Sequence, residues 1–441
     1  MGRADRRPAH DGRVIAVLVV PGQRPRVSRT GPGLVAGIVA LAAALGLALA
    51  GCSPGTTGTV VGTPAASGVS SVATTTGTSA ASAVSEAVPS YYAEATAARS
   101  PAYDSPDNIS VRVTGTGAAL ATVRPPAPYQ SFGYVYATAS PGVWVAGAQR
   151  WHPVGQDNGA QPVALFKVTF SPATRKVTLT RLPAPALPGS ALAAAALSPD
   201  GGSLAVATLT PPGGGSAPHS GGIWLSVYPL AGRATAVASR ELATIPYPTV
   251  ADDYSLTWLD DDRTVAVGGP FGPAKALAQA PAAVVYVDGT SAGLPVIRTV
   301  RLSFPPGKAS LAPATAPPRT CVGAPLATSD GQSVICGGTA ATTLNFGPAI
   351  NVGVWVFSAA TGKLTFTWDR HVTCCAISVF PGVLWASPNG GTVVADGLTQ
   401  ANEGAVLYVR PPDGHLRQIP WPGLSHYPGD PVNIIEPPVA W

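Results

Sequence analysis

The chain has 441 residues, which is long enough for more than one domain or for one large repeat domain. Charged residues make up only 11% of it, while 50 glycines and 47 prolines make it rich in turns, so the composition predicts an all-β fold of many short strands. Seven of the 27 basic and two of the 22 acidic residues precede Cys52, which leaves 20 of each beyond it and excludes electrostatic nucleic-acid binding by that neutral remainder.

The amino-terminal segment has the features of a membrane-targeting sequence. Residues Gly33 to Ala50 form an apolar run about long enough to span a bilayer, and a segment with three arginines precedes them. One interpretation is a retained signal-anchor helix. The four residues at the end of this run and directly after it favour a different interpretation.

Leu49, Ala50, Gly51 and Cys52 resemble the bacterial lipobox, in which small residues admit a signal peptidase and the cysteine thiol receives a lipid. The Ala-, Gly-, Pro- and Arg-rich composition is typical of a GC-rich genome, so the chain resembles an actinobacterial-type lipoprotein. The resemblance implies that residues 1–51 are a signal peptide. It also implies that palmitate-type acyl chains on Cys52 anchor the protein at the extracytoplasmic face of the cell membrane.

A polar, low-complexity segment follows Cys52. From Ser53 to about Ser100 the chain consists mainly of Ser, Thr, Ala, Gly and Val, with almost no charge and no apolar periodicity. Such a segment buries too little surface to offset the entropy of ordering it, so we predict a flexible linker over residues 52–104 with a reach of about 40 Å. Tyr91 and Tyr92 are interpreted as an incidental aromatic pair at the edge of the folded domain, residues 105–441.

An apolar hairpin recurs beyond the linker. Each copy has a short apolar strand, a turn of Ser, Pro, Asp, Asn or Gly, and a second apolar strand, as in the turn Ser198-Pro199-Asp200-Gly201. The turns are spaced at a nearly regular interval, which indicates an internal repeat. The copies are Tyr134–Ala148, Ala191–Leu209, Ser255–Gly268, Ala324–Gly337 and Val383–Ala395.

A second hairpin lies between successive copies of the first. It has a strand with an aromatic residue, a polar turn and a more exposed strand. Two hairpins in series predict a four-stranded antiparallel unit. The second hairpins are Pro162–Leu182, Gly222–Leu242, Val284–Leu302, Val352–Trp368 and Ala405–Ile419.

A four-stranded unit repeated in series is typical of a β-propeller. The Ser-Pro-Asp-Gly hairpins resemble those of TolB and WD40-like propellers of secreted bacterial proteins, over residues Ile109 to Trp441. Ile109–Arg124 has the form of a second hairpin without a first one, and Val432–Trp441 resembles an inner strand. We therefore expect the two ends to complete one blade together, which gives six blades, or seven if the linker or a long loop adds strands.

The cysteines of the propeller region lie close together in the sequence: Cys321, Cys336, Cys374 and Cys375. Export makes disulfides the expected state, and adjacent residues on a strand point to opposite faces, which disfavours a bond between Cys374 and Cys375. We expect Cys321 and Cys336 each to pair with one of the two adjacent cysteines, and a local Cys321–Cys336 bridge is the alternative. The spacing lacks Cys-x-x-Cys, so no metal site is expected.

The sequence shows no catalytic motif. It lacks a Gly-x-Ser-x-Gly elbow, a His-Glu-x-x-His helix and a phosphate loop beyond the linker, and no cofactor is expected. The run Asp260-Asp261-Asp262 occupies the turn position that is Ser-Pro-Asp-Gly elsewhere, so we interpret it as a solvated turn and not as a calcium loop. Asp200, Asp261, Asp330 and Asn389 are expected to be turn formers.

Longer segments separate the first hairpin of each unit from the second, and they should all emerge on one face of the ring. They are Trp151–Gln161, Thr210–Gly221, Pro270–Pro281 and Thr339–Asn351, and within them we expect Trp151, His152, His219 and Phe271 to contact a partner. Two functions follow. The first is a monomeric, membrane-tethered propeller that binds a protein, peptide or envelope component. The alternative is a propeller enzyme of the lactonase, lyase or glycosidase type.

Overall fold

The computed structural model describes residues 87–96, 108–150, 162–184, 187–188, 192–209, 222–231, 238–244, 254–271, 282–304, 320–321, 324–340, 349–373, 382–395, 407–410, 417–420, 425–427, 430–435 and 439–441. The chain divides into two compact units, Met1–Ala83 and Val84–Trp441, and every described residue belongs to the second. All regular elements among the described residues are β-strands. Accordingly, the described part of the chain contains no helix able to cross a membrane.

The five inner hairpins predicted from the sequence are confirmed. In each, two antiparallel strands meet at a turn of five or six residues. The pairs are β4 (Ser131–Ala137) with β5 (Val143–Gln149), β9 (Leu192–Leu197) with β10 (Ser203–Thr208), β13 (Ser255–Trp258) with β14 (Thr264–Pro270), β18 (Leu326–Ala327) with β19 (Ser333–Ala340), and β22 (Val383–Ala386) with β23 (Val393–Ala395).

The outer hairpins are confirmed as well, and each pairs with the second strand of the preceding inner hairpin. They are β6 (Pro162–Ser171) with β7 (Lys176–Arg181), β11 (Gly222–Pro229) with β12 (Ala238–Thr244), β15 (Ala282–Asp288) with β16 (Val296–Arg301), β20 (Ala349–Ser358) with β21 (Leu364–Thr373), and β24 (Leu407–Arg410) with β25 (Arg417–Ile419). Two short strands are added at blade edges, β8 (Leu187–Pro188) on β6 and β17 (Thr320–Cys321) on β19.

A further blade is assembled from distant parts of the chain, which confirms the expected closure. Its strand order is β28 (Val439–Ala440), β1 (Tyr91–Thr96), β2 (Asn108–Val113) and β3 (Ala119–Val123). We call it the closing blade. The structure corrects the linker boundary, because β1 lies within the segment expected to be flexible to residue 104 and pairs with strands on both sides.

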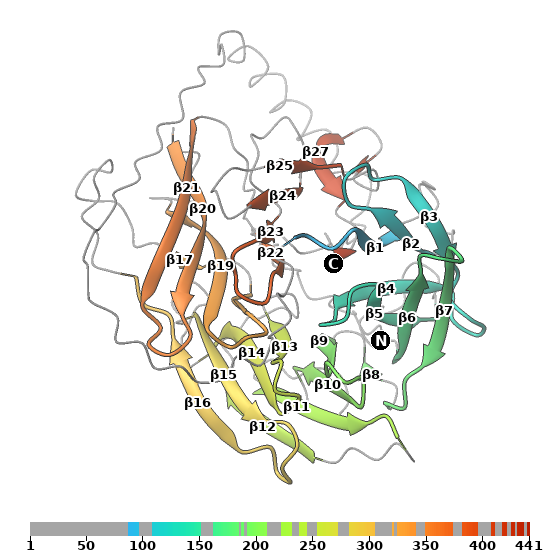
Figure 1. Ribbon diagram of the computed structural model, residues 1–441, viewed down its shortest axis with the longest axis horizontal. Helices are drawn as coiled ribbons and strands as arrows, with labels where there is room; N and C mark the ends of the chain where they lie inside the picture. Colours follow the sequence, from blue (N-terminus) through green and yellow to red (C-terminus); the bar gives the residue numbers. More distant parts are fainter. Residues whose placement is uncertain are drawn as a thin grey trace, which may run out of the picture. The chain divides into compact units, whose positions relative to one another are not determined.

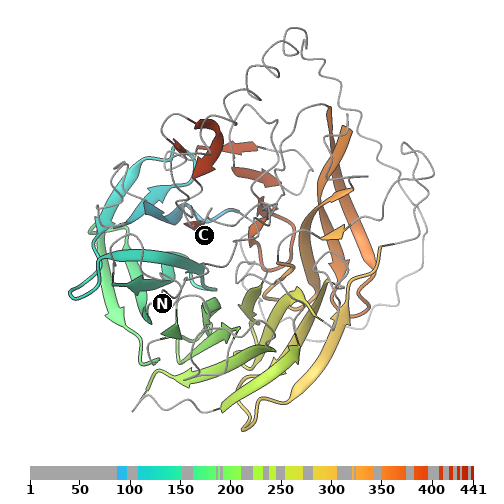
Figure 2. The same cartoon turned by 180° about the vertical axis from the view of Figure 1, so that it is seen from behind.

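The sheets form a ring, as Figures 1 and 2 show from its two sides, so the chain is an all-β propeller. Six sheets have four or five strands each, and β26 (Ser425–Tyr427) with β27 (Asp430–Ile435) forms a seventh sheet of two strands. A seventh blade would need further strands beside β26–β27. The neighbouring segments 411–416, 421–424 and 436–438 lie outside the described residues, so the blade number stays a prediction.

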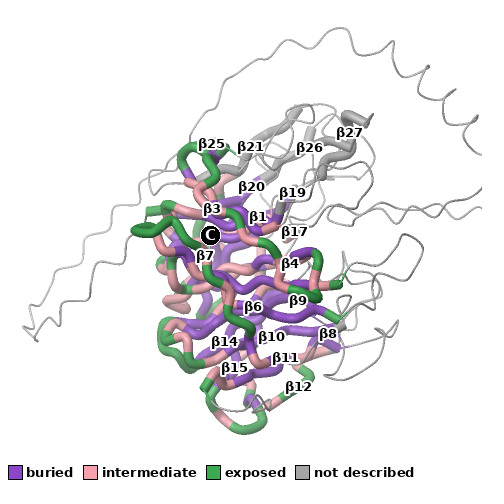
Figure 3. Tube along the Cα trace, turned by 90° about the vertical axis from the view of Figure 1, so that its right-hand side faces the viewer, coloured by how far each residue is buried: buried purple, intermediate pink, exposed green. Residues whose placement is uncertain are grey.

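The core lies in the seams between neighbouring blades. Six apolar clusters of described residues each join two blades, and together they connect the sheets around the ring. All six residues of β9 are buried, because an inner strand packs on both neighbours, whereas on the outer strand β16 exposed residues alternate with partly buried or buried ones. The tube in Figure 3 shows this gradient, with buried residues in the strands and exposed residues in turns and outer strands.

Candidate binding face

The two ends of the blades differ in the length of their connections. The inner turns, between the first and second strands, have five or six residues, whereas the connections between the second and third strands have eight to 13. Because all blades share one topology, these longer connections leave from the same end of each blade, opposite the inner turns. We call this end the connection face and the other end the turn face.

The residues expected to contact a partner belong, by sequence, to the connections between second and third strands. Trp151, His152 and His219 lie outside the described residues, so their role stays a prediction. Phe271, at the end of β14, is described and is only 7% exposed. It packs against Tyr254 with ring centroids 5.8 Å apart, so the expectation that Phe271 is a contact residue is wrong: its apolar ring fills the seam between blades.

The turn face carries the same side-chain clip in three blades. Ser198 donates its hydroxyl to Oδ1 of Asp200 at 2.5 Å, and the same oxygen accepts the backbone N–H of Gly202 at 2.8 Å. A carboxylate that accepts two bonds within five residues fixes the turn. The pairs Thr328–Asp330 and Ser387–Asn389 repeat it. The expectation that these residues are turn formers is confirmed.

The fourth copy of the turn uses a different residue at its tightest point. Gly201, Gly331 and Gly390 have φ between +68° and +71°, a conformation in which a side chain is strained. Asp262 occupies the corresponding position with φ +53°. An aspartate tolerates this region better than most residues, and its carboxylate accepts a hydrogen bond from the neighbouring blade.

Backbone groups of these turns bond from one blade to the next. The N–H of Asp200 donates to Oδ1 of Asp262 at 2.9 Å, and the N–H of Asp260 donates to the carbonyl of Ser329 at 2.8 Å. Finally, the N–H of Asp330 donates to the carbonyl of Pro388 at 3.2 Å. Four consecutive blades are therefore connected along the turn face by hydrogen bonds.

Two carboxylates of the turn face, those of Asp200 and Asp261, have a pKa below the usual value. The hydroxyl of Ser198 lowers the pKa of Asp200 below its usual value. Burial opposes ionisation of Asp261, but hydrogen bonds from Thr264 and the backbone outweigh it and lower the pKa of that carboxyl. Both groups are poor proton donors at neutral pH. No cluster of His, Cys, Asp and Glu able to hold a metal ion occurs among the described residues.

A second clamp joins the β13–β14 turn to the start of the β15–β16 turn. Asp288 accepts bonds from Nε and Nη2 of Arg263 at 3.0 and 2.6 Å, and from the hydroxyls of Thr290 and Ser291 at 2.8 and 2.7 Å. The arginine contacts, followed by those of Ser291 and Thr290, hold the pKa of Asp288 well below its usual range. This aspartate therefore serves a structural role.

The closing blade contains a buried ion pair that the sequence reasoning missed. Glu94 on β1 is fully buried, and it pairs with Nε of Arg112 on β2, whose Nη1 also donates to the carbonyl of Gly117 at 2.9 Å. The second oxygen, Oε1 of Glu94, has no partner within the described part of the chain. A glutamate inside the apolar segment 91–96 was the only available sequence signal.

Aromatic residues from both ends of the domain meet at β1, the strand that carries Glu94. Trp441 stacks on Tyr92 with ring centroids 4.7 Å apart, and its Nε1 donates to the hydroxyl of Thr114 at 3.2 Å. Tyr92 donates its hydroxyl to the carbonyl of Pro420 at 3.2 Å. Burial, aided by the charge of Glu94, raises the pKa of Tyr92 well above its usual value. Tyr92 is thus a core residue and not an incidental edge aromatic.

The disulfide expected between blades is wrong, because Cys321 bonds Cys336. The two cysteines lie on adjacent antiparallel strands, where Cys321 is opposite Gly338, and their Cα atoms are 5.7 Å apart. This distance suits a disulfide, so strand pairing selects the local bridge that the sequence left as the alternative. Cys374 and Cys375 lie outside the described residues.

The comparisons with known proteins find distant propellers. No protein-family profile and no curated protein matches the chain. TolB from Acinetobacter baumannii has a TM-score of 0.42 at 14% identity, covering 80% of this chain and 66% of its own, just under two thirds. The β-propeller domain of the Trilobed protease from Pyrococcus furiosus has a TM-score of 0.32 at 11% identity, covering 65% and 71%. The β-propeller domain of Cps50 (Swd1) from Myceliophteria thermophila has a TM-score of 0.34 at 10% identity, covering 67% of this chain and 88% of its own.

These similarities are too remote to assign a family or an activity. The class of the protein, a β-propeller, rests instead on the pairing of its own strands and on the ring that they form.

Proposed function

We propose that this protein is a membrane-tethered, extracytoplasmic binding module, in which the propeller presents its connection face to a protein, peptide or envelope component. The observation that carries the proposal is the asymmetry of the inner strands: connections of eight to 13 residues follow the second strands at one end, whereas inner turns of five or six residues, hydrogen-bonded from blade to blade, lie at the other. Long loops on a rigid frame are where binding residues concentrate.

The tether is the second part of the proposal. Lipid chains on Cys52 would hold the domain at the outer face of the cell membrane, and 38 residues separate Cys52 from the first strand residue, Tyr91. A flexible chain of that length has a root-mean-square reach of about 35 Å, which lets the connection face approach partners in the envelope. The domain acts as a monomer without a cofactor.

The test is affinity capture from envelope membranes with the full chain solubilised in mild detergent. The proposal predicts a specific partner whose recovery falls at least tenfold when Trp151 and His152, or His219, are replaced by alanine. Gln332→Ala on the turn face is the matched control, and it should leave recovery unchanged. If all variants recover the partner equally, the connection face is not the binding surface.

The tether is tested separately. Replacing Cys52 with alanine should abolish incorporation of a palmitate analogue and release the protein from membranes, because the acyl chains are then lost. Retention of the unlabelled variant in the membrane would favour the signal-anchor helix. Substrate turnover that one point substitution abolishes would instead establish the enzyme alternative.

A further inference from the structure

One inner turn of the turn face carries an amide where three others carry a carboxylate. Asp200, Asp261 and Asp330 occupy this position in three blades, whereas Asn389, followed by Gly390, occupies it in the β22–β25 blade. An asparagine before a glycine is chemically reactive, because a residue without a side chain leaves its backbone nitrogen free to approach the amide carbon. The exposed Asn389 is therefore a candidate for spontaneous modification.

The reaction of such a pair is an intramolecular displacement that needs only water. The backbone nitrogen of Gly390 attacks Cγ of Asn389, the bond from Cγ to Nδ2 breaks, and the proton of the attacking nitrogen leaves with Nδ2 as ammonia. Water then opens the cyclic imide at either of its two carbonyl carbons, which yields aspartate or isoaspartate. The reaction requires a backbone N–H that is free and an amide group that can rotate toward it.

Hydrogen bonds hold both reacting groups in the folded turn. The N–H of Gly390 donates to the carbonyl of Ser387 at 2.8 Å, so the attacking nitrogen is already engaged. Oδ1 of Asn389 accepts the hydroxyl of Ser387 at 2.8 Å and the N–H of Gly391 at 2.9 Å, so the amide rotates only if both bonds break. The turn must open before the nitrogen reaches the amide carbon.

The neighbouring blade also holds this glycine in place. Gly390 is buried with φ +70°, and a Cβ atom added to it would lie 3.2 Å from Cγ2 of Thr328 and 3.5 Å from Cδ1 of Ile335. The N–H of Asp330 donates to the carbonyl of Pro388 at 3.2 Å. Opening of the turn therefore also separates it from the β17–β21 blade.

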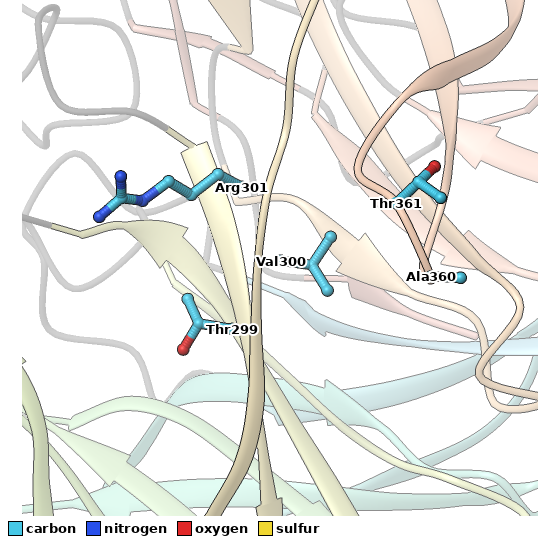
Figure 4. A pocket seen from close by; sticks show the side chains of 5 residues that line it. All are labelled: Thr299, Val300, Arg301, Ala360 and Thr361. Carbon is cyan, nitrogen blue, oxygen red and sulfur yellow. The ribbon is translucent and has the colours of Figure 1, made fainter.

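An outer turn of the β17–β21 blade makes the same kind of contact with the preceding blade. Gly362 has φ +68°, and a Cβ atom there would overlap the carbonyl oxygen of Arg301. Figure 4 shows Val300 of β16 directed toward the adjacent Ala360 and Thr361, beside an open pocket of about 530 Å³. Glycines with positive φ thus bring turns into direct contact with a neighbouring blade at two places in the ring.

The β22–β25 blade is built from short strands. They have three or four residues each, and none of the four residues of β22 is fully buried, whereas all six residues of β9 are. Segments that bury little apolar surface open locally more often than the rest of a domain. We therefore expect the β22–β23 hairpin to open while the rest of the ring stays folded.

We infer that Asn389 is a deamidation site gated by its own turn. The closed turn withholds the reaction and opening of the β22–β23 hairpin releases it, so the rate follows the population of the open hairpin. The aspartate product restores the carboxylate acceptor of the other turns, whereas isoaspartate adds a methylene group to the backbone and prevents the clip. This inference depends neither on the proposed binding function nor on the tether.

The experiment follows the mass gain of the amide-to-acid change at Asn389 in the full chain, kept in mild detergent at mildly alkaline pH. The same chain in concentrated guanidinium gives the rate of the open hairpin. Fragmentation of the digested peptides assigns the change to Asn389 and distinguishes aspartate from isoaspartate. We expect the folded chain to react at least about tenfold more slowly than the unfolded chain, with both products formed. Equal rates, or aspartate as the sole product of the folded chain, would overturn the gate.

Two matched serine variants test which turn is the gate. Ser387→Ala removes the bond to Asn389 and the bond that the hydroxyl accepts from the N–H of Thr392. It should accelerate deamidation of the folded chain about fivefold and leave the rate in guanidinium unchanged.

The control, Ser198→Ala, removes the same two bonds in the β9–β10 turn and should leave the rate at Asn389 within about twofold. Melting temperatures of both variants confirm folding. If Ser387→Ala does not accelerate the reaction, or if Ser198→Ala accelerates it equally, the proposal is overturned.

Discussion

The β9–β12 blade and the closing blade have the same strand order but different origins. In the first, each strand pairs with its neighbour in the chain, a five-residue turn joins the two inner strands, and the inner strand β9 is built of alanine and leucine alone. In the closing blade Ala93 pairs with Ala440, and the fully buried Glu94 occupies the strand between β28 and β2. A local hairpin obtains its register from its turn, whereas the pair of β28 with β1 joins distant segments and has no turn to set it.

Specific side-chain contacts take over that role in the closing blade. The stack of Trp441 on Tyr92 fixes β28 against β1, and the pair of Glu94 with Arg112 fixes β1 against β2. A one-residue slip of β1 would turn Glu94 toward the apolar cluster of Ala93, Ala95 and Phe132. We therefore expect the ring to be most sensitive to substitution here, and less sensitive at the repeated turns.

The largest effect is expected for Trp441→Ala. It removes a side chain that is 2% exposed, together with the bond to Thr114, and should lower the free energy of unfolding by about 4 kcal/mol in denaturant titrations. Trp441→Phe retains a ring over Tyr92 and should recover most of the loss. A cost below about 1 kcal/mol for the alanine variant would show that β28 does not secure the closure.

Next in size is Glu94→Ala, which leaves the guanidinium of Arg112 unpaired in a site where it is 14% exposed. The expected cost is about 3 kcal/mol, measured in the same titration. Replacing both residues with leucine should restore most of the stability, since no charge then remains buried. The exposed Glu241→Ala on β12 is the control, with a change within about 0.5 kcal/mol.

The contrast also explains what the sequence could reveal. The inner hairpins were predictable because Ser-Pro-Asp-Gly turns and apolar strands recur locally, and Asp200 could be identified as a turn former from its neighbours alone. Strand β1 was missed because the segment YYAEAT is short, follows a Ser- and Thr-rich linker and contains Glu94, whose partner is specified only by strand pairing. The Cys321–Cys336 bridge likewise depends on the register of β17, which no local pattern encodes.

The candidate surfaces were less predictable than the fold. Phe271 belongs to a long connection by sequence but is buried by the neighbouring Tyr254, since a strand end is packed where the loop beyond it need not be.

An intermediate effect is expected for Asp288→Asn, and it depends on pH. Because the folded-state pKa of Asp288 is depressed, its contribution is fully present above the unfolded value of about 3.9 and is lost as the pH falls below it. The substitution should cost about 1.5 kcal/mol at pH 7 through weakened bonds to Thr290 and Ser291, since exposed Arg263 adds little. Melting temperatures of the two proteins should converge below pH 4. A constant difference from pH 7 to pH 3 would contradict this assignment.

The smallest effect is expected for Asp200→Ala, because three other turns support the same face and the turn retains Gly201. Losing the bonds from Ser198 and Gly202 at an exposed site should cost about 1 kcal/mol or less. The reverse change, Asn389→Asp, adds a charged acceptor to an existing clip and should stabilise by a few tenths of a kcal/mol at pH 7. If Asp200→Ala destabilises the ring as strongly as Glu94→Ala, the turns contribute to ring closure as much as the closing blade does. A local hairpin would then depend on its blade-to-blade hydrogen bonds as strongly as the closing blade depends on its ion pair.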